Sequence, residues 1–272
     1  MWMGVLALAA ALTPVEKAVA YLSRQTPAWR LENRCFSCHN NGDGARALYA
    51  AGLAPDHPAL AETTAWLTHP ERWDSNPGDP AVSDKKLARI QFGAALLASG
   101  RREGLCLAAE QIAKERNADG SWTIDTGSPA TYGTALATYF AQRVLRVCGV
   151  DTQTTAAWFA GLQPRSTVDA AAQLLAQPGN RAARALLLRG QTRDGGWGEF
   201  PGLPAQAFDT ALAVIALRSG SEAARGRDWL IARQQEEGGW PETTRPPGAQ
   251  SYAQHISTSA WALLALLGQP LP

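Results

Sequence analysis

The sequence predicts an all-α protein built from about six helical hairpins. Alanine and leucine are abundant and β-branched residues are sparse, a composition that favours helices over strands. Apolar residues recur at helical spacing in segments separated by loops rich in Gly, Pro, Asn and Asp. Pairs of such segments return about every 40 residues, a period that is typical of a repeat array rather than of two unrelated domains.

Composition sets broad limits on the function. The 272 residues are 46% hydrophobic, which is ample for a packed core, and a formal charge of +1 without a Lys/Arg stripe argues against a nucleic-acid partner. The apolar run over residues 1–12 is too short for a membrane span. We interpret it as a secretory signal that precedes a folded domain over residues 13–272, which predicts a periplasmic or otherwise exported protein. The alternatives are a frayed helix start or a misplaced start codon.

The first expected hairpin begins with a helix-start signal. Residues 13–16, Thr-Pro-Val-Glu, combine a hydroxyl N-cap, proline at the first helical position and glutamate at the third. Apolar residues continue at helical spacing to Pro27, which is expected to end the helix because proline cannot donate a backbone hydrogen bond. A loop with Cys35–His39 follows, and a short return helix is expected over residues 45–53.

Five further hairpins follow from the same signals. Their expected bounds are, in order, residues 58–98, 106–147, 154–176, 181–219 and 222–267. The return helices of the second, third and fourth hairpins are expected over residues 83–98, 130–147 and 168–176. Loops rich in Gly, Pro, Asn and Asp separate these helices.

A motif closes the outgoing helix of the sixth hairpin, over residues 225–240. Trp229 and Leu230 share one helical stripe and can bury one face of the helix. Gln234 can bond backbone at the helix end, and Gly238 can turn the chain with positive φ. Trp240 then folds back over that turn.

Two weaker copies of the motif precede it. One ends at Trp197 with Gln191 in the glutamine place, and the other ends at Trp122 with Arg116 in that place. The pattern resembles the QW repeat of squalene-hopene cyclases, oxidosqualene cyclases and their prenyltransferase-like relatives. This resemblance implies a closed α/α toroid with outgoing helices outside and return helices inside. Six hairpins imply a single toroid, whereas the triterpene cyclases use two.

The resemblance also sets an expectation for catalysis. Class II terpene cyclases protonate an alkene with the middle aspartate of Asp-x-Asp-Asp-Thr-Ala at the start of an inner helix, and a base this weak needs a strong, positioned acid. The corresponding residues 206–211 keep only the final Asp-Thr-Ala, and Phe208 stands in the place of the proton donor. We interpret Asp209 as a helix N-cap. The zinc ligands of the protein prenyltransferases are also missing from the return helices, so neither activity is expected.

Residues 35–39, Cys-Phe-Ser-Cys-His, form the attachment sequence for c-type haem. Cys35 and Cys38 would bond the haem vinyl groups and His39 would bind the iron, which requires export in bacteria. Structural zinc or a Cys35–Cys38 disulfide are the alternatives. In a closed ring the second and sixth hairpins flank the first, so His69 and His255 are the candidates for a second axial ligand.

The remaining two cysteines lie at the start of an outgoing helix and at the end of its return helix. Antiparallel packing brings such positions together, so Cys106 and Cys148 are expected to form a disulfide in an oxidising compartment. The alternative is a pair of buried free thiols.

Aromatic residues on the return helices would face the axis of the toroid. The candidates for ligand contacts in the lumen are Phe92, Tyr132, Tyr139, Phe208 and Trp261. Such a lumen suits an isoprenoid or another apolar small molecule, although core packing explains the same residues equally well.

The leading hypothesis is therefore an exported toroid without the cyclase acid that binds haem c, or a metal, at residues 35–39. Its role would be electron transfer with a redox partner, or the binding of an apolar ligand. The first alternative is an enzyme that acts on a terpenoid or prenyl substrate through another acid. The second is a structural or protein-binding toroid.

Overall fold

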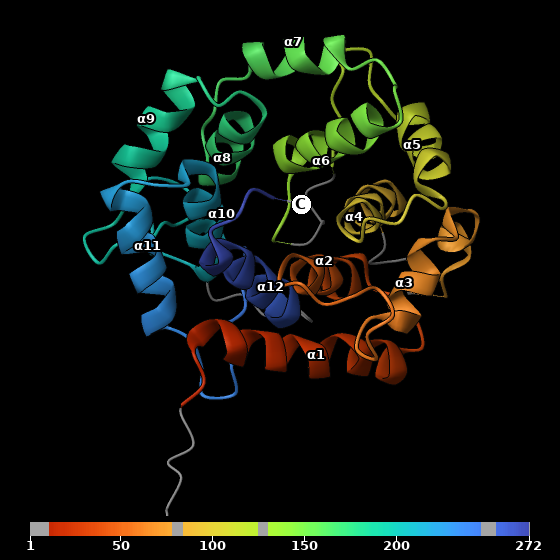
Figure 1. Cartoon of the computed structure of the whole chain (residues 1–272). Coiled ribbons are helices and arrows are strands. Elements are labelled where there is room, and N and C mark those ends of the chain that lie inside the picture. Colours follow the sequence, from red (N-terminus) through yellow and green to blue (C-terminus); the bar gives the residue numbers. More distant parts are fainter. Residues whose placement is uncertain (1–10, 78–83, 125–129, 246–253, 272) are drawn as a thin grey trace, which may run out of the picture.

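The computed structural model of the protein describes residues 11–77, 84–124, 130–245 and 254–271. Within these ranges helices alternate between an outer and an inner ring, and they confirm the predicted all-α toroid of six hairpins (Figure 1). The outer helices are α1 (Pro14–Asn33), α3 (Ala61–Leu67), α5 (Leu105–Lys114), α7 (Gln153–Gly161), α9 (Arg181–Gly190) and α11 (Ser221–Ala232). The inner helices are α2 (Asp43–Ala50), α4 (Lys85–Ala98), α6 (Thr134–Val147), α8 (Thr167–Ala176), α10 (Ala207–Leu217) and α12 (Gln254–Leu267).

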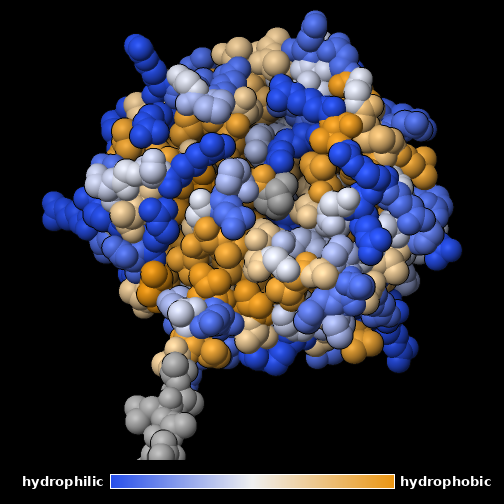
Figure 2. All heavy atoms as spheres, in the orientation of Figure 1, coloured by the Kyte–Doolittle hydropathy of each residue, from blue (hydrophilic) through white to orange (hydrophobic). Residues whose placement is uncertain are grey.

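The inner helices follow one another around the axis, each packed against the next. α12 packs against both α10 and α2, so the last hairpin closes the ring on the first. Apolar side chains from both rings merge into one continuous core. Figure 2 shows hydrophilic side chains projecting around the rim, with apolar residues exposed in separate areas between them.

The three repeat tryptophans are fully buried and make the same two hydrogen bonds. Nε1 of Trp122, Trp197 and Trp240 donates to the carbonyl ten residues earlier, at 2.8, 2.7 and 2.8 Å. The backbone N–H of each donates to a hydroxyl on the following inner helix, of Thr138, Thr210 and Ser259, at 3.0, 2.9 and 2.9 Å. Each indole therefore joins its outer helix to its inner helix while satisfying its own buried donor.

The glutamine of the motif joins one hairpin to the next. Gln234 Nε2 donates to the Gly238 carbonyl within its own turn and to the Pro14 carbonyl at the start of α1, both at 2.9 Å. The same link runs from Gln191 to the carbonyl of Glu222 at 2.9 Å and from Arg116 to the carbonyl of Asp151 at 2.6 Å. Arg116 thus makes the link that glutamine makes elsewhere, and the Gln234 contact closes the ring.

The first helix is longer than the sequence predicted. Pro27 lies inside α1, which continues to Asn33, so the expectation that Pro27 ends the helix is wrong. Proline removes one hydrogen bond from the helix but permits it to continue where other contacts hold the next turn. Asn33 Nδ2 donates to the Trp29 carbonyl at 2.9 Å, and Arg30 pairs with Glu62 of α3 at 3.2 Å.

The segment expected as a loop is partly helical. Residues Cys38–Gly42 form a π-helical turn, η1, that runs directly into α2, and α2 begins at Asp43 rather than at residue 45. Ser37 organises the turn, because its hydroxyl accepts from Asn40 N–H at 3.2 Å and its carbonyl accepts from Gly42 N–H at 3.2 Å. His39 is therefore placed by regular backbone hydrogen bonds rather than by a free loop.

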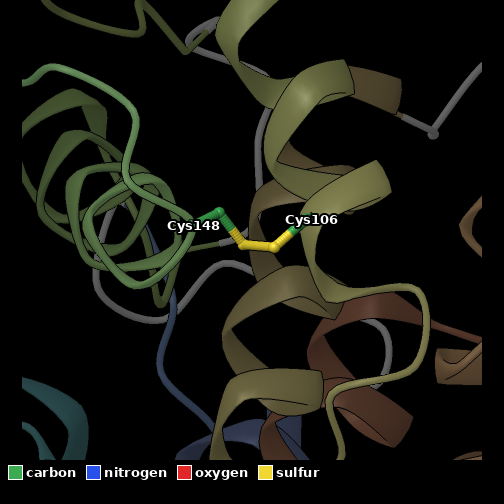
Figure 3. Close-up of a disulfide and its surroundings, with 2 residues drawn as sticks. All are labelled: Cys106 and Cys148. Carbon is green, nitrogen blue, oxygen red and sulfur yellow. A yellow bond between two sulfur atoms is a disulfide. The ribbon is translucent and has the colours of Figure 1, made fainter.

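A disulfide links the third hairpin internally (Figure 3). Cys106 lies in the first turn of α5 and Cys148 directly follows α6, and the bonded cysteines have Cα atoms 5.4 Å apart. Antiparallel packing of α5 against α6 brings these two positions together. All four cysteines of the chain lie among the described residues, and Cys35 and Cys38 are free.

The expected signal over residues 1–12 falls almost entirely outside the described residues, which begin at Ala11. Leu12 and the capping residue Thr13 are exposed just before α1. In the described part of the chain, no helix combines the length and the apolar character that crossing a bilayer requires.

The ring-closing turn gives a stability prediction. Gly238 has φ +102° and lies against the Lys17 carbonyl of α1, so the Cβ of Gly238→Ala would collide with backbone. Gly202 has a similar φ of +91° but open space around it. Gly202→Ala should cost about 1–2 kcal/mol from strain alone, whereas Gly238→Ala should cost about 3 kcal/mol or more. Urea unfolding followed by circular dichroism measures both changes in the free energy of unfolding. Equal decreases for the two variants would mean that the turn at Gly238 is not in close contact with α1.

Candidate functional site

The Cys35–His39 segment leads from the end of α1 into α2. It therefore lies at the end of the toroid where outer helices pass to inner ones. Phe36 stacks on Trp66, with ring centroids 4.7 Å apart and planes within 9° of parallel. Asn76 holds the Phe36 backbone from both sides, accepting from its N–H at 3.1 Å and donating to its carbonyl at 2.6 Å. These contacts fix the motif between the first two hairpins.

The His39 imidazole is anchored through one nitrogen only. Nδ1 lies 3.3 Å from Ser37 Oγ and 3.7 Å from Cys38 Sγ, whereas Nε2 has no hydrogen-bond partner among the described residues. Burial lowers the pKa of His39 to about 4, so the ring is neutral at pH 7. A neutral imidazole that is oriented through Nδ1 and has a free Nε2 is in the form that binds a metal ion.

The two thiols of the motif are held in their protonated form. Burial raises the pKa of Cys38 far above its ordinary value, and the nearby Asp43 raises it further. Burial also raises the pKa of Cys35, and Arg30 only partly opposes this. Zinc binds cysteine as the thiolate and needs four ligands. Among the described residues, no group of three or more His, Cys, Asp and Glu is arranged to hold a metal ion.

Both histidines expected as second ligands of the iron have hydrogen-bond partners of their own. His69 Nδ1 pairs with Glu71 Oε1 at 3.0 Å on the exposed approach to η2 (Pro70–Ser75). His255 Nε2 bonds Gln235 Oε1 at 2.7 Å, and its ring centroid lies 6.0 Å from that of Tyr21. The flanking hairpins are placed as predicted, and each of the two imidazoles has one nitrogen hydrogen-bonded to another residue.

Three of the five lumen candidates meet at the axis. Trp261 contacts Tyr132 and Phe208 edge-on, with centroids 6.0 and 5.4 Å apart, and all three side chains are buried. The other two pack further out, Tyr139 against Phe140 at 5.2 Å and Phe92 against Trp66 and Trp73 at 6.1 and 5.4 Å. A pocket of about 110 Å³ lies elsewhere, at the C-terminal ends of α8 and α10. These five aromatic side chains are buried and contact other rings.

An ion pair that the sequence analysis missed fills the centre of this cluster. The Arg46 guanidinium lies between the rings of Phe140 and Trp261, 4.5 and 4.2 Å from their centroids, and donates to Asp43 Oδ1 at 3.1 Å. Asp43 Oδ2 accepts from Ser257 Oγ at 2.7 Å and from Trp261 Nε1 at 3.2 Å. The sequence did contain a signal for this ion pair. Asp43 and Arg46 are oppositely charged and three residues apart in a segment of otherwise mostly small and apolar residues.

Two buried carboxyl groups have raised pKa values. Burial raises the pKa of Asp43 to about 6 in spite of the opposing Arg46, and burial raises that of Asp209 to about 6 in spite of Arg245. Asp209 is not the N-cap of its helix as expected, because Gln206 takes that position. Its oxygens instead accept from Arg245 at 2.7 and 2.8 Å, since the chain after α11 brings this counter-ion to α10.

Comparison with known proteins shows the fold alone. No family model and no curated protein matches the chain. Among solved structures, the type II terpene cyclase MstE from Scytonema matches with a TM-score of 0.61 and 17% identity over 93% of this chain and 96% of that one. An MstE variant in complex with geranylgeranyl dihydroxybenzoate matches with a TM-score of 0.54 and 16% identity, covering 94% and 99%. A wild-type glycosidase matches with a TM-score of 0.57 and 13% identity, covering 96% and 100%.

The raised pKa of Asp43 gives a prediction for stability against pH. Between its ordinary value of 3.8 and about 6 the folded protein binds a proton at this residue that the unfolded chain does not bind. Lowering the pH from 7 to 4.5 should therefore stabilise wild type relative to Asp43→Asn by about 1–3 kcal/mol. Comparing the two proteins is necessary because the lowered pKa of His39 acts in the opposite direction.

Urea unfolding at both pH values measures this difference. Asp56→Asn, which alters an exposed carboxylate, serves as the matched control and should show no comparable change with pH. A difference between wild type and Asp43→Asn that stays constant from pH 7 to 4.5 would contradict the assignment of proton binding to Asp43.

Proposed function

We propose that this protein is an exported toroid that carries c-type haem on Cys35 and Cys38, with His39 as an iron ligand. The observation that carries the proposal is the His39 ring, which is neutral, oriented through Nδ1 and free at Nε2. When bound, the haem supplies one-electron chemistry at its iron. Cys35 and Cys38 would supply the attachment points, and Ser37 would orient His39 through its Nδ1.

The number of available ligands favours haem over zinc. Zinc needs four ligands, and in the described residues no group of three or more His, Cys, Asp and Glu is arranged to hold a metal ion. A thioether bond to a haem vinyl group is uncharged, so its sulfur tolerates a buried position. Next to the motif, Asn40 is fully buried and both polar atoms of its side chain lack partners, which fits a further polar group at this place.

The cysteine pairing supports export. In an oxidising compartment the Cys106–Cys148 disulfide is stable, and attachment of haem c takes place in such a compartment. Cys35 and Cys38 are free, whereas the alternative hypothesis pairs them in a disulfide. Two free thiols at this spacing suit thioether bonds to haem. Electron exchange with a redox partner at this end of the toroid is the role that follows.

Covalent haem is the direct test. Wild-type protein expressed in the periplasm of a host with cytochrome c maturation should keep haem through denaturing electrophoresis and give a pyridine haemochrome spectrum. Cys35→Ala combined with Cys38→Ala should lose all covalent haem, because both thioether positions are gone. Cys106→Ala combined with Cys148→Ala is the matched control and should keep it. A colourless wild-type protein in this host would rule out haem attachment.

A second candidate is an enzyme that acts on a terpenoid, and Asp43 is the observation that favours it. The carboxyl group lies among aromatic rings at the start of an inner helix, with a pKa of about 6 that keeps part of the population protonated near neutral pH. MstE, which has a similar fold, was solved with geranylgeranyl dihydroxybenzoate. Such a prenyl-bearing phenol is the substrate class to test.

This candidate predicts product formation from geranylgeranyl dihydroxybenzoate, measured by mass spectrometry. Asp43→Asn should lower the rate at least about 100-fold because an amide cannot donate the proton. Asp209→Asn separates the contribution of the other buried carboxyl group. No product from wild type would reject this candidate, and loss of both haem and turnover would leave a structural or protein-binding toroid.

A further inference from the structure

The pocket of about 110 Å³ lies at the end of the toroid opposite the Cys35–His39 segment. It is found where α8 and α10, which pack side by side in the inner ring (Figure 1), reach their C-terminal ends. Two arginines line it, Arg184 from the outer helix α9 and Arg218, which directly follows α10. The rest of the lining is apolar and consists of Leu174, Leu175, Pro178, Ala216 and Leu217.

The backbone of Arg218 has a conformation that is rare for a residue with a side chain. Its φ of 64° and ψ of −54° are those of the γ-turn with positive φ, which is strained. The Ser219 N–H donates to the Leu217 carbonyl at 2.7 Å and closes this turn. Arg227 stabilises it, because its Nη1 donates to the Arg218 carbonyl at 3.3 Å.

Other inner helices are followed by glycine where the chain takes a positive φ. Gly268 directly follows α12 with a φ of 65°, and Gly100 and Gly149 lie just after α4 and α6 with φ values of 72° and 73°. Glycine adopts such angles without strain, so it would suit the position after α10 as well. The chain has arginine there instead, and strained residues cluster at functional sites.

Neither pocket guanidinium is paired with a carboxylate among the described residues. Arginine near a helix C-terminus can bond the last carbonyl groups, but in this part of the chain the side chains of Arg184 and Arg218 make no such hydrogen bond. The pKa of Glu222 is lowered by hydrogen bonds from its own N–H and from Ser221, and least by Arg184. Both positive charges are therefore available to a ligand.

The lining favours an anion that also has an apolar part. Guanidinium groups bind carboxylates and phosphates through paired hydrogen bonds. The C-terminal ends of α8 and α10 carry partial negative charge, so an anion needs both arginines to bind here. Hydrocarbon attached to the anion would cover the apolar lining, which an inorganic ion would leave exposed to water. A pocket of about 110 Å³ holds roughly four groups of the size of water, so the hydrocarbon inside it is short.

We propose that this pocket binds the carboxylate end of a small aliphatic acid. Arg184 and Arg218 bind the carboxylate, and the side chains of Leu174, Leu175 and Leu217 contact the hydrocarbon. The pocket lies at the other end of the ring from the proposed haem-attachment segment, so it adds a ligand-binding function whose test does not depend on haem.

Butyrate is the probe, because it combines one carboxylate with a short hydrocarbon chain. In NMR titrations of the full chain, the methyl signals of Leu174, Leu175 and Leu217 should shift and saturate with butyrate. Butyramide has the same shape without the charge and should not shift them. Inorganic phosphate has the charge without the hydrocarbon and should bind at least about tenfold more weakly. No saturable shift with butyrate, or binding of either comparison compound as tightly as butyrate, would overturn the proposal.

Two substitutions test the arginines separately. Arg184→Ala and Arg218→Gly should each raise the Kd for butyrate at least about tenfold, because each removes a charged donor. Arg189→Ala, on the same outer helix but outside the lining, is the matched control and should keep the affinity of wild type. Unchanged affinity in either pocket variant, or an equal loss in the control, would contradict binding by these two side chains.

The strain at Arg218 gives a second measurement on the same variant. Arg218→Gly should unfold at no lower urea concentration than wild type, since glycine adopts the positive φ without strain. Loss of butyrate binding without loss of stability would show that the arginine is kept for the ligand. A lower urea midpoint would mean that the side chain stabilises the fold itself, and it would overturn the argument from strain.

Discussion

The toroid depends on a repeated polar contact between the turn after one outer helix and the start of the next. Gln234 makes this contact across the whole length of the chain, bonding its own turn and the Pro14 carbonyl at 2.9 Å. Without Gln234 the carbonyl groups of Pro14 and Gly238 would lose this donor. The last hairpin would also lose this hydrogen bond to the first. Arg116 shows that the constraint is the carbonyl contact rather than the identity of the side chain.

Closure of the ring decides what occupies its axis. Because α12 packs on α2, Trp261 and Ser257 reach the Asp43 carboxylate, and Arg46 lies between aromatic rings. A buried charge is tolerated when it is paired, and here Arg46 Nη2 pairs with Asp43 while two aromatic rings face the guanidinium, whose Nε and Nη1 have no hydrogen-bond partner among the described residues. The chain shares its fold with a terpene cyclase and a glycosidase, and three of its lumen aromatics are buried against one another. The proposed haem-attachment residues 35–39 lie at the end of the ring.

Local patterns predicted much of the fold, and they led to the proposal of a haem site on residues 35–39. Helical spacing, the capping signal at Thr13 and the repeat ending at Trp240 depend on residues close together in the chain. The Cys35–His39 segment is contiguous, so its match to the haem-attachment sequence could be recognised from the sequence. The π-helical turn at Cys38–Gly42 was missed, because it depends on the hydrogen bonds of Ser37 and on packing against α4. The continuation of α1 past Pro27 was also missed, because it depends on contacts of the next turn, such as the ion pair between Arg30 and Glu62 of α3.

The sequence by itself determined the helical class, the number of hairpins and the segment that carries the thiols and the imidazole. Only the tertiary structure decided which charges meet at the axis and which imidazoles remain available to the motif. Asp43 and Trp261 are 218 residues apart, and Gln235, in the loop that follows α11, binds His255 of α12. Such partners are chosen by ring closure and by competition among neighbouring side chains, and neither leaves a mark in the spacing of residues along one helix.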